Sequence, residues 1–299
     1  MIDQIKALLG AEHVLEQEPM SRHTTFRIGG PVRAMLLPQS ASQLVQLVQL
    51  LSEHREPFLI FGNGSNLLVP DEGIDRYIIK IEQAISRYRI DGSQVIAEAG
   101  VLLSELAQAA MEAELTGFEF ASGIPGTLGG AVYMNAGAYG GEMKDVVRWV
   151  EVIDEHGDNL IVDRSAMDFG YRMSAVRNRG WIVLRVCLDL SQGKYDEIKA
   201  RTDDLTEQRV SKQPLELPSA GSVFKRPPGH FAGKLIQDAG LRGAKIGGAQ
   251  ISEKHCGFIV NVDGATCCDV LNLVEYVRQE VASQFGVELE REIRIFGQE

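Results

Sequence analysis

The chain has 299 residues, of which 44% are hydrophobic, so it can bury a sizeable core and form two or three domains. Its net charge of −11 disfavours non-specific binding to nucleic acid or to an anionic membrane, and it has no apolar run of the roughly 18 residues that span a bilayer. The N-terminus lacks the basic start of a signal peptide, and neither the 4 cysteines nor the 6 histidines have disulfide or metal-ligand spacing. We therefore expect a cytoplasmic protein without a metal site, a nucleic-acid partner or a membrane partner.

Hydrophobic periodicity predicts a mixture of helices and strands along the whole chain. We expect helices at residues 41–53, 102–115, 195–214 and 269–286, and strands at 58–61, 76–81, 94–100, 149–163 (two strands joined by a Gly-Asp turn), 181–190, 257–262 and 291–296. The helix at 195–214 is polar and highly charged, which is typical of a connecting helix at a domain boundary. Because antiparallel hairpins alternate with helices, we expect an α+β fold rather than a doubly wound parallel sheet.

Residues 58–69, FLIFGNGSNLLV, place a glycine turn after a short apolar strand. The turn is not a P-loop, because it lacks the lysine and the following hydroxyl, and it is not GxGxxG, because Leu67 stands at the third glycine position. Its main-chain N–H groups, with the side chains of Ser65 and Asn66, can still converge on an anion. An ordinary turn leading into the next strand explains the same residues, and the local sequence leaves both interpretations open.

A second glycine-rich stretch, ASGIPGTLGGAVYMNAGAYGGEM, covers residues 121–143. Ordering so many glycines is unfavourable unless the backbone must approach something closely, and Pro125 stiffens the first turn. Two such stretches, separated by a strand and a helix, indicate a cofactor held between two small subdomains. A dinucleotide, with its pyrophosphate and long attached body, fits that description.

The last third of the chain contains candidate catalytic side chains. Ser222 follows a glycine in AGSVFKRP, close to Lys225, and can donate a proton or bind an anion. A turn serine is the competing interpretation, because neither a GxSxG elbow nor a His–Asp pair accompanies it. Glu288, Glu290 and Glu292 alternate along the predicted last strand, which is also the usual pattern of a solvated face.

Basic residues upstream are candidate anion ligands. Arg172 follows Tyr171 in FGYRMSAVRNRG. Arg209 and Lys212 lie one helical turn apart and can clamp one phosphate group. Exposed helix or loop surface explains each of these residues equally well on local sequence.

A series of motifs connects these features. The chain contains, in order, TTFRIGGP, GNGSNLL, SGIPGTLGGAVYMNAGAYG, YRMS, RVSKQP, SAGSVFKRP, ISEKHCGFIVN and LEREIRIFG. From about residue 20 to the C-terminus, this series resembles the UDP-N-acetylenolpyruvoylglucosamine reductase family. The resemblance implies an α+β fold, with a two-subdomain FAD-binding module of the vanillyl-alcohol-oxidase type at 1–80 and 81–194, and an α+β substrate-binding domain at 195–299.

The resemblance also implies a reaction and its reactants. Members of the family reduce FAD with NADPH and then transfer hydride to the enolpyruvyl double bond of UDP-N-acetylglucosamine-enolpyruvate. The product, UDP-N-acetylmuramate, is a peptidoglycan precursor. We therefore expect FAD as the cofactor, NADPH as the co-substrate and the enolpyruvyl UDP-sugar as the substrate of a monomeric enzyme. Neither glycine-rich stretch contains histidine or cysteine, which argues against covalent attachment of the flavin.

Roles carry over to matching positions of this sequence. The resemblance implies that Arg172, Ser222 and Glu292 are catalytic and that Tyr171, Arg209, Lys212 and Lys225 bind the substrate. It implies that FAD lies along Arg27, Gly62, Asn63, Gly64, Ser65, Asn66, Leu67, Gly123, Ile124, Pro125, Gly126, Thr127, Gly129, Gly130, Ala131 and Asn135. In the family, the Arg-x-x-Lys pair that matches Arg209 and Lys212 contacts the diphosphate of the UDP group.

The implied division of labour is physically reasonable. Hydride added to one alkene carbon leaves an enolate, which needs charge stabilisation and a proton. Arg172 can stabilise the developing oxyanion, and a protonated Glu292 can share that role. Ser222 can donate the proton, although a serine is a weak acid that needs a neighbouring charge, for which Lys225 is the nearest candidate.

The chain departs from the family pattern at two places. Arg226 stands where many members have asparagine, and the chain lacks the tyrosine-containing loop that longer members insert before the substrate domain, so it resembles the shorter subtype.

Two other functions are alternatives to the reductase: another FAD-dependent oxidoreductase, such as an oxidase, and a non-catalytic UDP-sugar-binding protein. The second does not explain why Ser222, Arg172 and Glu292 all match catalytic positions.

Overall fold

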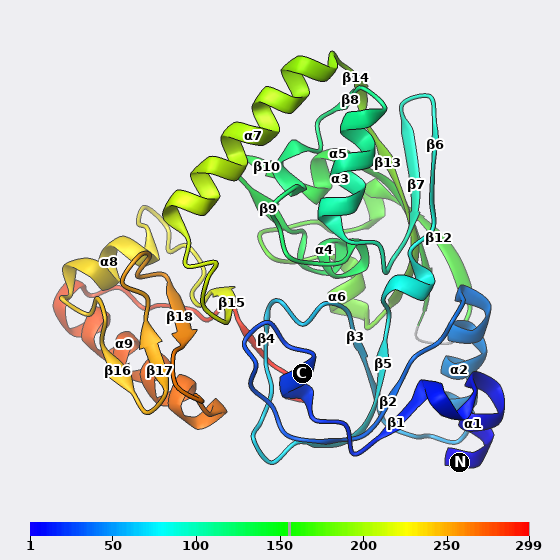
Figure 1. The fold of residues 1–299 in the computed structure, drawn as a ribbon, viewed down its shortest axis with the longest axis horizontal. Coiled ribbons are helices and arrows are strands. Elements are labelled where there is room, and N and C mark those ends of the chain that lie inside the picture. Colours follow the sequence, from blue (N-terminus) through cyan, green and yellow to red (C-terminus); the bar gives the residue numbers. More distant parts are fainter. Residues whose placement is uncertain (155–156, 299) are drawn as a thin grey trace. The chain divides into compact units, whose positions relative to one another are not determined.

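The computed structural model describes residues 1–154 and 157–298, which form two compact units (Figure 1). The first unit contains residues 1–16, 34–63 and 76–209, and the second contains residues 17–33, 64–75 and 210–299. Each unit has its own buried hydrophobic core. The second unit is therefore assembled from three separated segments. The expected three-domain division, with boundaries at 80 and 194, stays a prediction.

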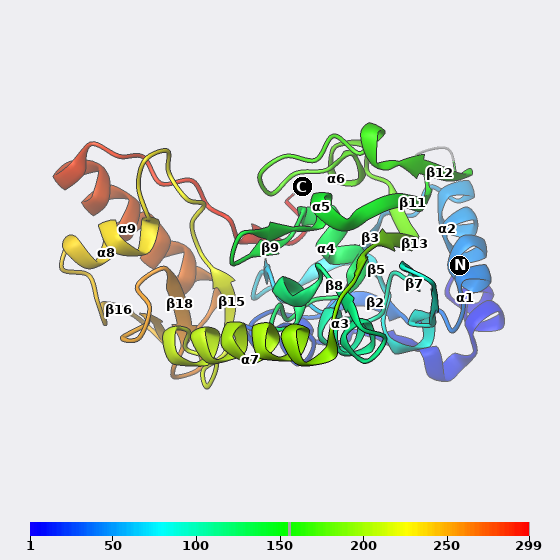
Figure 2. The ribbon, with the colours of Figure 1, turned by 90° about the horizontal axis from the view of Figure 1, so that it is seen from above.

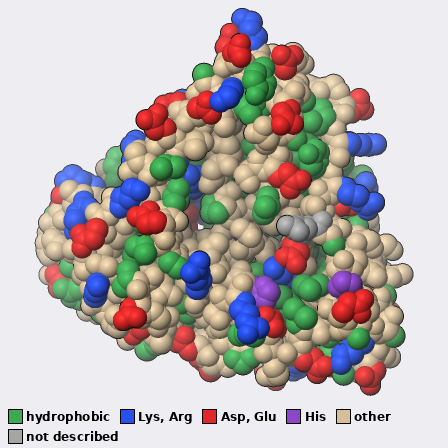
Figure 3. Space-filling view, viewed as in Figure 1, with side chains coloured by type: hydrophobic (Ala, Val, Ile, Leu, Met, Phe, Trp, Pro, Cys, Tyr) green, Lys and Arg blue, Asp and Glu red, His purple; other side chains and the backbone are tan. Residues whose placement is uncertain are grey.

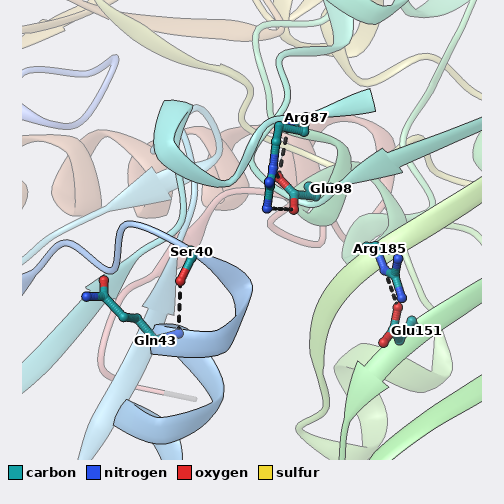
Figure 4. Close-up of polar contacts among 6 residues, drawn as sticks. All are labelled: Ser40, Gln43, Arg87, Glu98, Glu151 and Arg185. Carbon is teal, nitrogen blue, oxygen red and sulfur yellow. Dashed lines mark hydrogen bonds and ion pairs between the residues drawn. The ribbon is translucent and has the colours of Figure 1, made fainter. Parts of the chain in front are cut away.

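A four-stranded sheet lies mainly in the first unit. Its order is β1 (Val14–Glu16), β2 (Val32–Leu36), β5 (Ile74–Lys80) and β3 (Phe58–Phe61), with β3 and β5 parallel. Helices α1 (Ile2–Leu9) and α2 (Ala41–Glu53) belong to the same unit. The side chain of Ser40 accepts a hydrogen bond of 3.2 Å from the Gln43 N–H, capping α2 at its predicted start (Figure 4).

A five-stranded antiparallel sheet forms the larger part of the first unit. Its order is β12 (Asn159–Asp163), β11 (Val147–Ile153), β13 (Ile182–Asp189), β7 (Gln94–Glu98) and β6 (Tyr88–Asp91). Glu155 and His156, between the two predicted strands at 149–163, lie outside the described residues. The unit also contains the helices α3 (Leu103–Glu112), α4 (Leu128–Met134), α5 (Met143–Val146) and α6 (Ala175–Arg179). Two short strand pairs belong to it as well: β9 (Gly137–Ala138) with β10 (Gly141–Glu142), and β8 (Leu115–Thr116) with β14 (Ser191–Gln192).

Two buried carboxylates on this sheet are paired with arginines. Glu98 accepts a hydrogen bond of 3.1 Å from Arg87, and Glu151 pairs with Arg185 (Figure 4). Burial raises the pKa of Glu151, but hydrogen bonds from Arg185 and Asn159 outweigh it and hold that pKa below its usual value. Both of these buried carboxylates therefore have an arginine partner within the protein.

Helix α7 (Tyr195–Lys212) is the polar helix that the sequence predicts at 195–214 (Figures 1 and 2). Its buried residues are Ile198 and Leu205, and ion pairs such as Lys199–Asp203, at 2.5 Å, lie along its exposed surface. Such i, i+4 pairs stabilise a helix only modestly. The helix therefore has little apolar contact of its own, as its composition indicates.

A four-stranded antiparallel sheet forms the centre of the second unit. Its order is β15 (Ser219–Ser222), β18 (Phe258–Asn261), β17 (Ala249–Ile251) and β16 (Lys245–Ile246), and the unit also contains α8 (Ala232–Asp238) and α9 (Cys267–Phe285). A parallel pair joins β4 (Leu67–Leu68) to β19 (Arg294–Ile295). The carboxylate of Asp71 accepts the N–H groups of Cys267, at 2.8 Å, and Cys268, at 3.3 Å, which ties the 64–75 segment to the start of α9.

The predicted fold class is confirmed. Mostly antiparallel sheets and helices form an α+β fold, α9 ends at a left-handed Gly286 with φ of 68°, and α2 has its predicted bounds. The predicted last strand at 291–296 is wrong in extent, because only Arg294–Ile295 form a strand, and the glutamates at 288–292 do not lie on a regular strand. Single turns of 3₁₀ helix occur at Ala11–His13, Met20–Arg22, Gln83–Ile85, Glu119–Ala121 and Arg164–Ala166.

On the face drawn in Figure 3, lysine and arginine side chains are interspersed with aspartate and glutamate side chains. Within the described residues, no helix is both long enough and apolar enough to cross a membrane.

Candidate active site

The two glycine-rich stretches meet within the first unit. The side-chain amide of Asn63 donates a hydrogen bond of 3.1 Å to the carbonyl of Pro125. A Cβ atom on Gly62 would lie 2.6 Å from the Thr127 hydroxyl oxygen, so only a glycine allows this approach. The start of GNGSNLL and the turn GIPGT therefore form one surface, although more than 60 residues separate them in the sequence.

The glycines of the second stretch serve two purposes. Gly129 lets α4 pack on the end of β7, because a Cβ there would lie 2.9 Å from the Cβ of Ala99, whose carbonyl accepts the Gly129 N–H at 2.8 Å. Gly123 instead makes room for a side chain, since its Cβ would lie 2.8 Å from Cδ of Arg209. Close approach explains both glycines, as the sequence predicts, but only Gly123 lies against a charged group.

Arg209 of the first unit is a buried cation with incomplete hydrogen bonding. Its Nε and Nη1 atoms are buried and have no hydrogen-bond partner among the residues that the structure describes. Burial lowers the pKa of Arg209, and the neighbouring Tyr139 raises it. A guanidinium stays protonated even so, and a buried charge without a partner is strongly unfavourable. The site therefore suits an anion that the protein itself does not supply.

Tyr139 belongs to the second glycine-rich stretch, and no role is predicted for it from the sequence. It lies between β9 and β10 with φ of 52°, in the left-handed region that bulky residues rarely adopt. The Ala-Tyr-Gly-Gly sequence around it predicts a tight hairpin turn, and this glycine pattern is the sequence feature that could have drawn attention to Tyr139. Only the fold brings this turn near Arg209.

Arg172 lies on a strained turn of the first unit. Its φ is 58°, and a bridge between Gly170 and Met173 closes the turn around it. The guanidinium of Arg177 donates a hydrogen bond of 2.8 Å to the Arg172 carbonyl, and the Arg172 guanidinium lies 5.0 Å from the ring centre of the exposed Tyr171. Left-handed non-glycine residues cluster at functional sites, where surrounding contacts maintain the strain.

Asn135 links the second glycine stretch to the Arg172 turn. It caps α4 with φ of 41° and is fully buried. Its amide donates hydrogen bonds of 2.8 Å to Glu142 and 2.9 Å to the Gly170 carbonyl, while its oxygen accepts the Lys144 N–H at 2.9 Å. The Asn135 side chain thus fixes the position of the turn from inside the protein.

In the second unit, Ser222 and Glu292 are carried by adjacent main-chain segments. Ser222 ends β15, where Gly221 has φ of 76° and the pairing with β18 shifts register. The Glu292 N–H donates a hydrogen bond of 2.7 Å to the carbonyl of Val223, the residue after Ser222. Glu292 is half-buried, whereas Glu288 and Glu290 are exposed, so burial separates the glutamate implied by the family from its neighbours.

The second half of the first glycine loop lies beside Glu292. The side-chain amide of Asn66 donates a hydrogen bond of 3.4 Å to the Glu292 carbonyl, and the Arg294 N–H donates one of 3.1 Å to the Asn66 carbonyl. These contacts continue into the β4–β19 pair. Asn66, which is expected to bind the cofactor, and Glu292, which is expected to be catalytic, are therefore neighbours within the second unit.

The segment around Arg27 joins the same group. Thr25 donates its hydroxyl to the Ser219 carbonyl at 2.6 Å and its N–H to the Gly64 carbonyl at 3.2 Å. Arg27 is exposed and has φ of 57°, between the buried side chains of Phe26 and Ile28. The TTFR motif therefore ties the first glycine loop to the strand that ends in Ser222.

Two basic side chains after Ser222 already have protein contacts. Lys225 pairs with Glu290 through its Nζ, and its N–H donates to the Glu290 carbonyl at 2.8 Å. The Arg226 guanidinium lies 3.9 Å from the ring centre of the exposed Phe231. The positive charge expected to assist Ser222 is thus partly compensated by Glu290.

Histidine and cysteine side chains offer no obvious chemistry. Within residues 1–154 and 157–298, no group of three or more His, Cys, Asp or Glu residues has a metal-binding arrangement. All four cysteines are free thiols, and burial raises the pKa of Cys267 to about 12. His255 is largely buried, accepts the Gly257 N–H at 3.1 Å and packs edge-on against Phe258, so it has a structural role.

Comparison with known proteins identifies the family. Residues 32–163 match the FAD binding domain family, and residues 213–296 match the family described as UDP-N-acetylenolpyruvoylglucosamine reductase, C-terminal domain. The UDP-N-acetylenolpyruvoylglucosamine reductase of Caldanaerobacter subterraneus subsp. tengcongensis is 52% identical over 298 residues, which cover 100% of this chain and 98% of that relative.

Solved structures agree with the sequence matches. The crystal structure of UDP-N-acetylenolpyruvylglucosamine reductase from Thermus caldophilus has a TM-score of 0.82 at 36% identity, covering 94% of this chain and 98% of that one. An alkyldihydroxyacetonephosphate synthase, with a TM-score of 0.51 at 14% identity, covering 64% of this chain and 40% of that one, shares only the fold, which is of the vanillyl-alcohol-oxidase type. The chain therefore belongs to the UDP-N-acetylenolpyruvoylglucosamine reductase family, the FAD-dependent oxidoreductases of peptidoglycan precursor synthesis.

Proposed function

We propose that this chain reduces the enolpyruvyl group of UDP-N-acetylglucosamine-enolpyruvate to UDP-N-acetylmuramate, with NADPH as the reductant. The observation that carries the proposal is the main-chain hydrogen bond of 2.7 Å from Glu292 to Val223, which sets a half-buried carboxyl beside the strand end that bears Ser222. A non-catalytic UDP-sugar-binding protein does not need that pairing.

The residues present fit a non-covalent FAD. Gly62 and Gly123 stand where a Cβ would collide with Thr127 and Arg209, and Arg209 has two buried nitrogens without a partner in the described chain. We assign the cofactor to Arg27, to residues 62–67 and to the second stretch at Gly123, Ile124, Pro125, Gly126, Thr127, Gly129, Gly130, Ala131 and Asn135. Asn135 acts there from within the protein, because its side chain is buried. The flavin, when bound, passes hydride from NADPH to the substrate.

The catalytic roles follow from the charge that develops on the substrate. Hydride addition to the alkene leaves negative charge on the enolate oxygens. We assign Arg172 and a protonated Glu292 to stabilise that oxyanion, and Ser222 Oγ to donate the proton to the neighbouring carbon. A fixed guanidinium on a strained turn needs no reorganisation when the charge appears, which is the basis of electrostatic catalysis.

The remaining polar residues are assigned to the substrate. Tyr171 is exposed next to Arg172, and Lys212 is exposed at the end of α7. Lys225 follows Ser222 by three residues, and its pairing with Glu290 keeps its ammonium group near this turn. We further propose that the enzyme is a cytoplasmic monomer with the three-part division 1–80, 81–194 and 195–299.

Half-reactions of the flavin test the proposal. Purified protein loaded with FAD is expected to lose its yellow colour on anaerobic addition of NADPH and to regain it with the enolpyruvyl UDP-sugar. In Ser222→Ala, reduction by NADPH is expected to persist while reoxidation by the substrate slows by about 10²–10⁴-fold.

Ser219→Ala is the matched control for this experiment. Ser219 lies on the same strand, and its contact with the Thr25 hydroxyl uses its main-chain carbonyl rather than its own hydroxyl. Full turnover in Ser222→Ala removes the proton-donor role, and a protein that takes up no FAD removes the proposal as a whole.

A further inference from the structure

Arg209 lies near the end of α7 with its side chain against Gly123 of the second glycine stretch. A Cβ on Gly123 would lie 2.8 Å from Cδ and 3.1 Å from Nη1 of Arg209. Ordinary carbon contacts are longer, so any side chain at 123 would push the guanidinium away. The glycine therefore keeps open the position that Arg209 occupies.

The guanidinium is buried without compensation. Nε and Nη1 find no hydrogen-bond partner in the described part of the chain, although each is shielded from solvent. Arg87 and Arg185 in the same unit are paired with Glu98 and Glu151. The neighbour that raises the pKa of Arg209 is Tyr139, which is no permanent anion. Arg209 thus differs from Arg87 and Arg185, because neither of its two buried nitrogens has a carboxylate partner in the described residues.

The position of Gly123 identifies the kind of anion. The turn that begins at Gly123 reaches Pro125, whose carbonyl accepts the hydrogen bond of 3.1 Å from Asn63 of the first glycine loop. Neither turn contains an acidic side chain that would repel an anion. A phosphate at this surface can accept two parallel N–H bonds from one guanidinium, which is the geometry that arginine favours.

We propose that Arg209 binds a phosphate of the FAD pyrophosphate and does not form a two-residue clamp on the UDP diphosphate with Lys212. This inference rests on the proposed function for the identity of the cofactor. Arg209 and Lys212 are three residues apart on α7, but their environments differ. Arg209 is wedged against Gly123, whereas Lys212 is exposed at the last residue of the helix.

Flavin fragments provide the test. Dissociation constants of FAD, FMN and riboflavin are measured on the apoprotein by quenching of flavin fluorescence, for the parent chain and for Arg209→Gln. Because hydrogen bonds to charged groups are the stronger ones, Arg209→Gln is expected to weaken FAD binding by about 10–100-fold and to leave riboflavin binding unchanged. Arg201→Gln, which alters an exposed arginine of the same helix, is expected to change none of the three constants.

The competing source of phosphate is tested in the FAD-loaded protein. UDP is titrated while the flavin spectrum is followed. The parent chain and Arg209→Gln are expected to bind UDP equally. If Arg209→Gln binds FAD as tightly as the parent but loses UDP affinity, the arginine serves the substrate and the inference is overturned.

A second variant guards against a fold defect. Gly123→Ala is expected to lower FAD affinity in the parent chain but to add little in the Arg209→Gln background, because both changes remove the same contact. Additive effects contradict the inference. A parent chain that binds no FAD overturns the proposed function together with the inference, whereas normal FAD binding by Arg209→Gln overturns the inference alone.

Discussion

The two units carry their candidate functional residues in different ways. In the first unit, Gly62 and Gly123 contribute by lacking a Cβ, and the guanidinium of Arg209, with two buried nitrogens that lack a partner in the described residues, lies against Gly123. In the second unit, Ser222 and Glu292 contribute side chains held on hydrogen-bonded main-chain segments. The first arrangement suits the binding of a large, fixed group, and the second suits chemistry at one atom.

The difference predicts that mutations at the first unit's Gly62 and Gly123 affect binding, whereas mutations at the second unit's Ser222 and Glu292 affect turnover. A side chain introduced at Gly62 or Gly123 would occupy the space next to Thr127 or Arg209 and is expected to reduce cofactor affinity. A side chain removed at Ser222 or Glu292 is expected to leave the cofactor bound and slow the reaction, because it acts only when charge develops on the substrate.

After Ser222→Ala, Glu292→Gln is expected to have the largest effect on turnover. The amide keeps the size of the side chain but is a weaker hydrogen-bond donor to the developing oxyanion than a carboxylic acid, so steady-state kcat is expected to fall by about 10²–10³-fold with FAD affinity unchanged. Glu288→Gln is the control, because Glu288 is exposed on the same segment. Loss of FAD affinity in Glu292→Gln would contradict the separation of the two units' roles.

Gly62→Val is expected to act on binding instead. Its Cβ would enter the 2.6 Å space next to the Thr127 hydroxyl. Overpacking of this kind costs about 1–3 kcal/mol, so the FAD dissociation constant is expected to rise by roughly 5–150-fold, measured by flavin fluorescence.

Gly92→Ala is a control of comparable strain. Gly92 has φ of 57° in the turn between β6 and β7, with open space around it. It is expected to lower stability without changing FAD affinity. If it weakens FAD binding as much as Gly62→Val does, the effect of Gly62→Val is a general loss of stability.

Asn135→Ala is expected to lower the stability of the first unit. The substitution leaves the Gly170 carbonyl and the Lys144 N–H without their partners of 2.9 Å in a buried location. Loss of such contacts lowers the free energy of unfolding by about 2–3 kcal/mol, which urea denaturation measures. Asn178→Ala, at an exposed position of α6, is expected to have little effect, and an equal loss there would argue against the specific role of Asn135.

Local patterns predicted the elements of the fold better than their assembly. Helices α2 and α7 follow from periodicity and composition, and the left-handed end of α9 follows from Gly286. The strand at 291–296 was predicted too long, because its pairing depends on Leu67–Leu68, more than 200 residues earlier. No local signal indicates that 17–33 and 64–75 join the C-terminal unit, since that assembly rests on contacts such as Asp71 with Cys267.

The candidate site was predictable where a motif marks a side chain. Ser222 and Glu292 were found as residue types in motifs, and burial then distinguished Glu292 from Glu288 and Glu290. Arg209 was expected beside Lys212 because helical spacing is the only relation that a sequence shows directly. Its contact with Gly123, 86 positions away, arises from tertiary packing and could not be inferred from the helix alone.

The smallest predicted effect concerns pH and belongs to the second unit. Burial lowers the pKa of His255, with Arg242 acting in the same direction against an opposing hydrogen bond, so the folded state binds this proton less readily than the unfolded state. Stability from the neutral ring is therefore present above the unfolded pKa of about 6.5 and is lost as pH falls below it. Urea midpoints at pH 7.5 and 5.5 are expected to differ less in His255→Phe than in the parent chain. An equal pH dependence in both proteins would assign the loss to groups other than His255. Glu151 in the first unit does not explain it, because its lowered pKa makes its contribution fail only in more acidic solution.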